Sequence, residues 1–437
     1  MFPIPTARLV LIGVVASLAV LFVPLHPPFG LLAADGALLA LAGADLMGSA
    51  DPGVIEVERD LPAGLTLGAG GGDIGWRVHN PTTRALEVSV ADELAPSLRA
   101  GSRRFRARVP AGATVNARTP IDPMRRGRFQ PAHVAVRVQG RLGLVARQRT
   151  RDLPGTLRVL PPFRSRSEAE LRIRRGRLLE VGLRSAQGRG GGTEFDSLRE
   201  YSVDDDVRRM DWAATARSTR PIVRTYRAER NQQVLVLLDT GRVMAGEAQG
   251  VPRLELAMDA AMMLTAVASR LGDRCGLVAF DREVRAVVPP GQGTAQLSRV
   301  TEAVFDLDPR LVESDYLGAF TSTLARFRRR ALLVLITELS EEAVSDTLVP
   351  TLPLLLARHL VIVASVSDPD VDRWASEVPP DATVAYRMAA AEGALERRMR
   401  TAGLLRGLGA TVVDDPPARL ASRLADAYLD VKAAGRL

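Results

Sequence analysis

From Val234 to the C-terminus, short apolar runs alternate with amphipathic stretches. The runs read VLVLLD, CGLVAFD, ALLVLITEL, LVIVASVSD and ATVVDD, and a helix rich in alanine and methionine is expected from Arg253 to Leu271. Strands that are apolar throughout, with helices between them, are typical of a parallel sheet that is covered on both faces. The pattern predicts that residues 234–437 form a doubly wound α/β domain that ends in helices.

Residues 51–160 follow a different pattern, in which apolar and polar positions alternate. Ile74, Trp76 and Val78 are separated by single small or polar residues, and the stretch from Val134 to Val138 repeats the alternation. A period of two, interrupted by turn residues, predicts an all-β, sandwich-like domain of roughly 100 residues. Because sandwich folds carry many functions, this domain is predicted to be a spacer or docking surface.

The N-terminus contains two apolar runs separated by a proline-rich break. Two membrane helices are predicted, at about 4–25 and 29–47, in a hairpin that occupies residues 1–50. Arg8 precedes the hairpin and arginine-rich sequence follows it, so the positive-inside rule predicts that the soluble domains are cytoplasmic. The alternatives are a cleaved signal peptide and a buried hydrophobic hairpin.

Charge and cysteine content narrow the possible partners and compartments. The formal net charge is +8, but Lys432 is the only lysine and the arginines are scattered along the chain. Since no nucleic-acid recognition module is found either, no nucleic acid is expected as a partner. Cys275 is the only cysteine, so an intramolecular disulfide is excluded, as is usual for a cytosolic protein.

The segment from Gly188 to Glu229 has charges of both signs at high density, next to aromatic residues. The motifs TEFDSLREY, DDVRRMDWAATAR and VRTYRAERNQ precede LLDTG in that order. This order resembles the bacterial "domain of unknown function 58" family, over roughly residues 160–437. Family members usually read Pro-Gly-Asp where this chain has Val203, Asp204 and Asp205. The resemblance implies a von Willebrand factor A-like fold for residues 234–437 and a partnership with MoxR-type AAA+ ATPases.

Residues 161–233 are then a signature segment that leads into the A-like domain, and two interpretations of it remain open. In the first, its charges form an ion-pair lattice that fastens the segment to the sheet, with Trp212 as the apolar anchor, because like charges repel unless they are paired. In the second, part of the lattice is exposed and is recognised by a partner. The candidate residues are Glu194, Arg199, Tyr201, Asp205, Asp206, Arg208, Asp211, Trp212, Arg217 and Glu229.

The resemblance also bears on metal binding. A-domains hold a divalent cation with Asp-x-Ser-x-Ser, a threonine and a further aspartate, at the sheet edge where ligands bind in such folds. Asp239 keeps the first position, but two serines are replaced by Gly241 and Val243. Asp239, Asp315 and Glu338 are the candidate ligands of a degenerate Mg²⁺ site. The alternative is that Asp239 caps a helix or pairs with an arginine.

No catalytic constellation is found in the sequence. The four histidines are dispersed, no G-x-S-x-G nucleophile elbow occurs, and the glycine-rich runs lack the Gly-Lys-Ser/Thr end of a phosphate loop. The chain is therefore predicted not to be an enzyme and, apart from Mg²⁺ at the degenerate site, to need no cofactor.

Two functions are compatible with these observations. The first is a non-enzymatic adaptor or scaffold, anchored as a multi-pass protein in a bacterial cell membrane. It works with a MoxR-type AAA+ ATPase in the assembly or maturation of protein complexes or the cell envelope, on protein clients that the sequence does not name. The second is a divalent-cation-dependent binding or adhesion module, or an enzyme, that uses Asp239.

Overall fold

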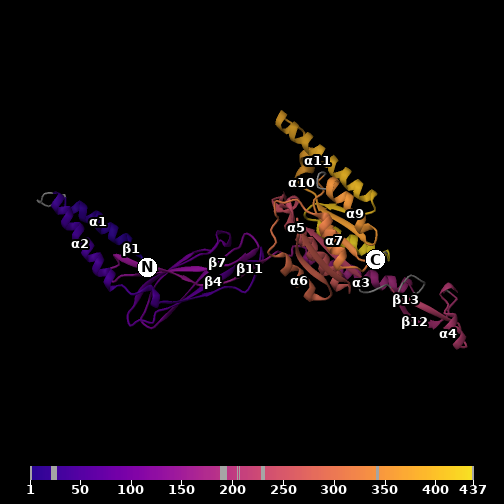
Figure 1. Ribbon diagram of the computed structural model, residues 1–437, viewed down its shortest axis with the longest axis horizontal. Helices are drawn as coiled ribbons and strands as arrows, with labels where there is room; N and C mark the ends of the chain where they lie inside the picture. The colour runs from indigo at the N-terminus through magenta and orange to yellow at the C-terminus, as the bar shows by residue number, and fades with distance from the viewer. Residues whose placement is uncertain are drawn as a thin grey trace. The chain divides into compact units, whose positions relative to one another are not determined.

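The chain is a multidomain protein with mixed α/β sheets. The computed structural model describes residues 2–20, 27–187, 194–203, 205, 207–227, 232–340 and 344–435. These residues belong to two compact units, Met1–Leu160 and Pro161–Leu437 (Figure 1). Each unit has its own hydrophobic core, and each is described by itself below.

The first unit begins with a short strand and two apolar helices, β1 (Phe2–Pro5), α1 (Ala7–Val20) and α2 (Pro27–Gly48). Among the described residues, one helical stretch, Pro28–Val54, is long and apolar enough to cross a membrane. The first helix was predicted to start at about residue 4 but starts at Ala7, because Phe2–Pro5 pair with strand β10. At 1.5 Å per residue, the 14 residues of α1 extend about 21 Å, which is short of a hydrocarbon core of about 30 Å.

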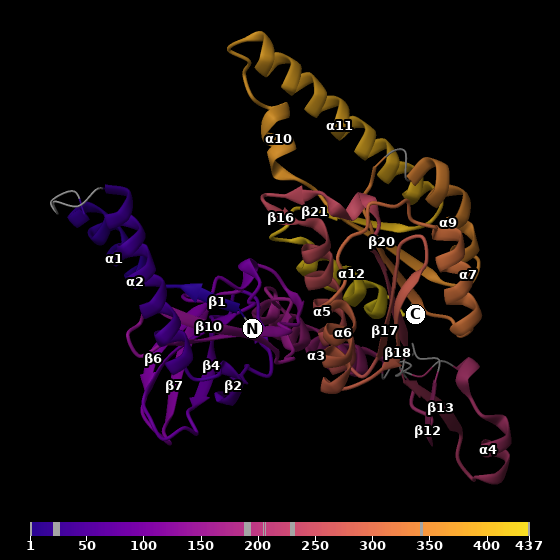
Figure 2. The same cartoon turned by 60° about the vertical axis from the view of Figure 1, so that its left-hand side comes forward.

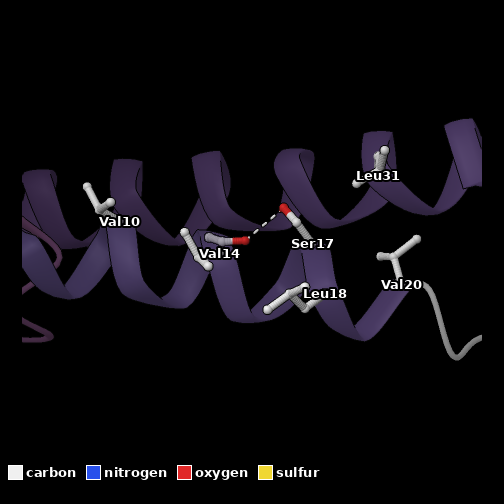
Figure 3. Close-up of a pocket in the computed structure, with 7 residues that line it drawn as sticks. Val10, Val14, Ser17, Leu18, Val20 and Leu31 are labelled. Carbon is white, nitrogen blue, oxygen red and sulfur yellow. Dashed lines mark hydrogen bonds between the residues drawn. The ribbon is translucent and has the colours of Figure 1, made fainter.

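Helices α1 and α2 pack closely against each other. A Cβ added at Gly30 of α2 would lie 2.7 Å from a methyl group of Val20 in α1, so the glycine allows the close approach. An apolar groove runs along the pair, and within α1 the Ser17 hydroxyl donates to the carbonyl oxygen of Gly13 (2.8 Å; Figure 3). The groove is lined by Val10, Gly13, Val14, Ser17, Leu18, Val20 and Leu31.

The rest of the first unit consists of three β-sheets around one core. Their strand orders are β1-β10-β9-β5-β6, β2-β4-β7 and β3-β11-β8. The inward positions of the alternating pattern are buried, as at Ile74, Trp76 and Val78 of β4 and at Val134 and Val136 of β9. The strands are β2 (Glu56–Asp60), β3 (Leu65–Thr66), β4 (Gly72–His79), β5 (Leu86–Asp92), β6 (Arg104–Val109), β7 (Thr114–Ile121), β8 (Gly127–Phe129), β9 (His133–Gln139), β10 (Val145–Asp152) and β11 (Leu157–Leu160).

One buried carboxylate joins α2 to the sheet. Asp45, in the last turn of α2, accepts hydrogen bonds from the backbone N–H groups of Leu142 (2.7 Å), Leu144 (2.8 Å) and Val145 (3.0 Å). Leu142 and Leu144 lie in the turn between β9 and β10, and Val145 is the first residue of β10. On the other side of the turn, the Thr6 hydroxyl donates to the carbonyl oxygen of Leu144 (3.0 Å). The helix pair is thereby held in a fixed orientation against this sheet.

The second unit is built on a six-stranded sheet with the order β18-β17-β14-β19-β20-β21. All neighbouring strands are parallel except the edge strand β18, which is antiparallel to β17. The apolar runs predicted as strands coincide with the five parallel strands. The strands of the sheet are β14 (Gln233–Asp239), β17 (Arg274–Phe280), β18 (Val284–Gly291), β19 (Leu332–Ile336), β20 (Leu360–Val366) and β21 (Thr411–Asp415).

Helices cover both faces of this sheet (Figure 2). Val234, Val236 and Leu238 of β14 face a core that includes α5 and α12, whereas Leu235 and Leu237 face a second core that includes α7 and α9. Because successive side chains of a strand point to opposite faces, a strand buried on both sides reads as continuously apolar. The helices are α3 (Arg166–Gln187), α5 (Arg253–Arg270), α6 (Thr294–Val304), α7 (Tyr316–Arg326), α9 (Val349–Leu356), α10 (Pro369–Ala375), α11 (Ala382–Gly407) and α12 (Leu420–Ala433).

The signature segment is divided between helix α3, whose Ala169 and Ile173 belong to the core that includes α5 and α12, and a small hairpin that follows it. Strand β12 (Glu194–Glu200) pairs antiparallel with β13 (Ile222–Arg227), and α4 (Trp212–Arg217) lies in the connection between them. We call residues 194–227 the hairpin lobe.

Candidate functional site

The hairpin lobe is held together by two charged pairs. Arg199 donates from both terminal guanidinium nitrogens to Asp205, at 2.7 and 2.5 Å, and the backbone N–H of Ser202 donates to the same carboxylate (2.9 Å). The side chain of Asp205 is only 7% exposed. A bidentate pair of this kind fixes the planes of both groups, so it determines the course of the chain after β12.

The second pair is centred on Asp211, the N-cap of α4. Its carboxylate accepts from the backbone N–H of Ala214 (2.9 Å) and from Nε of Arg224 in β13 (2.8 Å). The hydrogen bond from Arg224, followed by the one from Ala214, lowers the pKa of Asp211 below its usual value. The same carboxylate therefore starts the helix and fastens it to the opposite strand.

Trp212 is not the apolar anchor that the first interpretation predicted. Its side chain is 67% exposed, and it shares the exposed surface of the lobe with Val203 (92%), Val207 (54%) and Leu198 (47%). The prediction assumed that a large aromatic residue beside paired charges would be buried against the sheet. Instead, the pairs described here join residues within the lobe, so the lobe holds its shape while apolar side chains remain in solvent.

The remaining sequence candidates occupy varied places. Tyr201 is half-buried and its N–H donates to the carbonyl oxygen of Pro221 (2.9 Å); Arg208 is exposed, and Nε of Arg217 donates to the carbonyl oxygen of Ala213 (3.1 Å). Asp206, Glu229 and the side chain of Glu194 lie outside the described residues. The sequence pattern did not single out Arg224, Glu200 or Arg220, although the last two form an exposed pair at 2.7 Å.

The second candidate site lies at the carboxyl end of β14. Asp239 is fully buried and its two carboxylate oxygens accept four hydrogen bonds. Oδ1 accepts from the Ser314 hydroxyl (2.6 Å) and the N–H of Gly241 (2.8 Å). Oδ2 accepts from the hydroxyls of Tyr316 (2.9 Å) and Thr337 (2.7 Å). Burial raises the pKa of Asp239, and the hydrogen bond from Ser314 is the largest opposing cause.

Tyr316 completes this network from the first turn of α7. Burial, and then the nearby charge of Asp239, raises the pKa of its phenol well above the usual value, so the group stays protonated and can donate. Its hydroxyl also lies 2.9 Å from the Thr337 hydroxyl. The sequence pattern identified Asp239 and the end of β19 but missed Ser314 and Tyr316, which stand on either side of the predicted Asp315.

The other two predicted ligands have different partners. Asp315 is exposed and caps α7 by accepting from the N–H of Gly318 (2.9 Å). Glu338 pairs with Arg398 of α11 and lies 3.4 Å from Nε of Arg253. Within the part of the chain that the structure describes, no three His, Cys, Asp or Glu side chains are grouped so as to hold a metal ion. The structure gives each of the three carboxylates a protein partner, and Mg²⁺ binding stays a prediction.

Residues 197–401 match the family described as "Protein of unknown function DUF58", which confirms the family resemblance over this range. Three mycobacterial proteins, "Uncharacterized protein Mb1516" of Mycobacterium bovis and "Uncharacterized protein MT1527" and "Uncharacterized protein Rv1480" of Mycobacterium tuberculosis, are 32% identical over 187 residues. The match covers 41% of this chain and 56% of each relative, so the chain spans little more than half the length of these relatives.

Two solved structures resemble parts of the chain. The first is described as the conserved hypothetical protein BatB from Bacteroides thetaiotaomicron, with 12% identity and a TM-score of 0.30, covering 47% of this chain and 99% of that one. The second is WR4, a C. elegans MSP family member, with 13% identity and a TM-score of 0.17, covering 24% of this chain and 97% of that one. TM-scores this low support no assignment.

Proposed function

We propose that this protein is a non-enzymatic, membrane-anchored adaptor that presents a docking surface to an AAA+ ATPase, by family resemblance one of the MoxR type. The ATPase supplies the energy, and the adaptor supplies the location or the choice of client. The work is the assembly or maturation of protein complexes or of the cell envelope. In this proposal α1 and α2 form a membrane hairpin with the soluble domains in the cytoplasm, followed by a sandwich-like domain and a von Willebrand factor A-like domain.

Membrane anchoring is supported by the surface of the two helices. Val10, Leu11 and Val15 of α1 and Phe29 and Leu32 of α2 are each more than half exposed, and no described side chain of α1 is buried. Soluble proteins rarely expose a continuous apolar surface of this kind, because its contact with water is unfavourable. A lipid environment removes that cost.

The observation that carries the docking proposal is the exposure of Trp212 on a preorganised lobe. Tryptophan is enriched among the residues that contribute most to protein binding. The pairs Arg199–Asp205 and Arg224–Asp211 fix the lobe before any partner arrives, so little conformational entropy is lost on association.

Co-purification from detergent-solubilised membranes, with and without nucleotide, tests the proposal. An AAA+ ATPase is expected to co-purify with the native chain, and Trp212→Ala is expected to weaken its binding about 30-fold, the effect of losing about 2 kcal/mol. Tyr386→Ala, which removes another exposed aromatic side chain (78%), serves as the matched control for surface changes. The proposal is wrong if no AAA+ ATPase is retained under any nucleotide condition.

The alternative is a cation-dependent module at Asp239. It is favoured by one observation, the convergence of three hydroxyl oxygens, from Ser314, Tyr316 and Thr337, on a buried carboxylate. Oxygen atoms are the ligands that Mg²⁺ prefers. These hydroxyls donate hydrogen bonds to Asp239, so a bound ion would have to replace those hydrogen bonds. This alternative predicts that millimolar Mg²⁺ raises the unfolding temperature of the native chain and not that of Asp239→Ala. The adaptor proposal predicts that Asp239→Ala leaves capture of the ATPase nearly intact.

A further inference from the structure

The turn between β9 and β10 lies beside the end of the membrane-length helix. Asp45 of α2 holds the N–H groups of this turn, and Thr6, just before α1, binds its carbonyl groups. The start of α1, the end of α2 and the turn are therefore at one level of the molecule. In a membrane-anchored chain, this level is where the hydrocarbon ends and the lipid headgroups begin.

Two arginines are exposed at this level. A Cβ added at Gly143 would lie 2.9 Å from a terminal nitrogen of Arg8, and one added at Gly48 would lie 3.9 Å from Cδ of Arg141. Arg8 thus lies against the turn, and Arg141 lies against the end of α2. Both side chains are exposed, and neither forms an ion pair within the described residues.

Two exposed apolar side chains lie near these arginines. Leu142, at the tip of the turn, is 52% exposed, and Met47, in the last turn of α2, is 85% exposed. Both continue the exposed apolar surface of the helix pair to the level of the arginines. Cationic groups beside apolar side chains match the boundary between phosphate headgroups and acyl chains, where arginine binds phosphate by paired hydrogen bonds.

We propose that Arg8, Arg141 and Leu142 form a binding surface for the headgroups of anionic phospholipids, with Leu142 inserted at the boundary of the acyl chains. The inference rests on the proposed membrane anchoring and extends it from the helices to the β-sheets. Because Asp45 fixes the turn to α2, headgroup binding sets the orientation of these sheets relative to the bilayer. The occupant is lipid rather than protein, since the surface is continuous with the apolar face of α2 and its charge is complementary to phosphate.

A thiol label at residue 142 reports whether the turn reaches the lipid. Cys275 is completely buried, and burial raises the pKa of its thiol to about 12, so it does not compete for the label. The full chain carrying Leu142→Cys and a fluorophore is reconstituted in liposomes of phosphatidylcholine alone or with added phosphatidylglycerol. Arg103→Cys is the control, because Arg103 is exposed and lies at the other end of the sheet, beside Asp92.

The label at residue 142 is expected to be protected from an aqueous quencher, and more so in phosphatidylglycerol membranes, while the label at residue 103 is quenched equally in both. Each arginine near an anionic surface is expected to contribute about fivefold to this protection. Adding Arg8→Gln and Arg141→Gln should therefore bring the protection in the two membranes to the same value. The matched change Arg103→Gln, added to the labelled Leu142→Cys chain, should leave the protection of residue 142 as it was.

Two results overturn the inference, and they are distinguishable. If the chain remains in the liposomes after an alkaline wash but residue 142 is quenched as readily as residue 103, the headgroup surface is wrong and the anchor stands. If the chain separates from the liposomes, the membrane-anchored function itself is wrong, and this inference with it.

Discussion

Asp239 occupies the position expected for a cation ligand, but its carboxylate binds protein donors. The carboxylate stands at the end of β14, where a cation ligand was expected, but four protein donors take its lone pairs. Hydrogen bonds to a carboxylate favour its charged form, whereas burial disfavours that form. At Asp239 the effect of burial is larger, so the pKa is raised. At this site the hydrogen bonds join β14, β19 and the start of α7.

The raised pKa of Asp239 predicts a specific pH dependence. Between the unfolded value of about 3.8 and the higher folded value, the folded state binds more protons, so the free energy of unfolding falls as pH rises. Asp239→Asn removes this titration. The free energy of unfolding can be measured with urea for the full chain in detergent. As pH rises through that window, the value for the variant should increase relative to the value for the native chain. Above the window, the difference between the two values should be constant.

Ser314→Ala provides the control for this prediction. It removes one donor to Asp239, at a cost of about 1 kcal/mol, and keeps the carboxyl group, so the pH slope of the native chain should remain. A difference between Asp239→Asn and the native chain that does not vary with pH would contradict the assignment.

For single residues, the sequence predicted the place of a residue in its strand or helix better than the residues that surround it. It placed Asp239 correctly at the strand end, because a strand buried on both faces is readable as an apolar run. It could not predict that Ser314 and Tyr316 meet Asp239, since 75 and 77 residues separate them and no periodicity links such a pair. The burial of Trp212 was also predicted wrongly. The hydrophobicity of a side chain does not show whether another apolar surface lies near enough to cover that side chain.

Among the elements, α2 has an end that a buried carboxylate joins to a sheet. An aspartate in an apolar helix is unfavourable in lipid, yet Asp45 is 2% exposed and satisfied by three backbone N–H groups. The carboxylate is therefore part of a joint between helix and sheet. The sequence showed the charge near the end of the apolar run, but the partner turn lies about 100 residues away, beyond any local pattern.

Asp45→Ala tests this joint. The change leaves three N–H groups of the turn without their acceptor, two of them buried, and is expected to lower the free energy of unfolding of the first unit by about 2 to 4 kcal/mol. Thermal unfolding in detergent measures the loss. Asp35→Ala, at an exposed position of the same helix, should not destabilise the unit. Equal losses in the two variants would show that Asp45 has no special role.

Helix α11 is attached in a comparable way, through Arg398. Its guanidinium donates to Asp414 of β21 (2.8 and 2.7 Å), to the Ser365 hydroxyl (2.8 Å) and to Glu338. Burial by itself would lower the pKa of Arg398, but the hydrogen bonds and charges of Asp414 and Glu338 together outweigh it and raise the pKa above its usual value. The arginine therefore ties α11 to the carboxyl ends of three strands.

Arg398→Met is expected to destabilise the second unit by about 3 kcal/mol, because it removes the main partner of the buried Glu338 and of the partly buried Asp414. Arg400→Met is the matched control on the same helix. Its pair with Glu396 is exposed (59% and 69%), so the loss should be at most about 1 kcal/mol. Chemical unfolding monitored by circular dichroism distinguishes the two. Recovery of most of the stability in the triple variant with Glu338→Gln and Asp414→Asn would confirm the cause.

At the scale of the whole molecule, the chain consists of two units whose hydrophobic cores share no residues. The sequence predicted a boundary at residue 160, where the pattern with a period of two ends, and an alternation of strands and helices that begins at Val234. It missed the antiparallel edge strand β18 and the pairing of β1 with β10. Neither follows from hydrophobic pattern, since register depends on partners that are distant in the chain.

Separate cores predict separate unfolding. Calorimetry of the full chain in detergent is expected to show two transitions, and a fragment of residues 161–437 should reproduce one of them with its midpoint shifted by no more than a few degrees. A single transition in the full chain, with a fragment that fails to fold, would mean that the units depend on each other.

The phenol of Tyr316 carries an evolutionary consequence. Its hydroxyl is shared between Asp239 and Thr337, and the Thr337 hydroxyl itself donates to Asp239. Replacement by phenylalanine would leave Asp239 with three of its four donors, the hydroxyls of Ser314 and Thr337 and the N–H of Gly241. A lineage in which this codon changes to phenylalanine would therefore lose one donor and keep the remainder of the network.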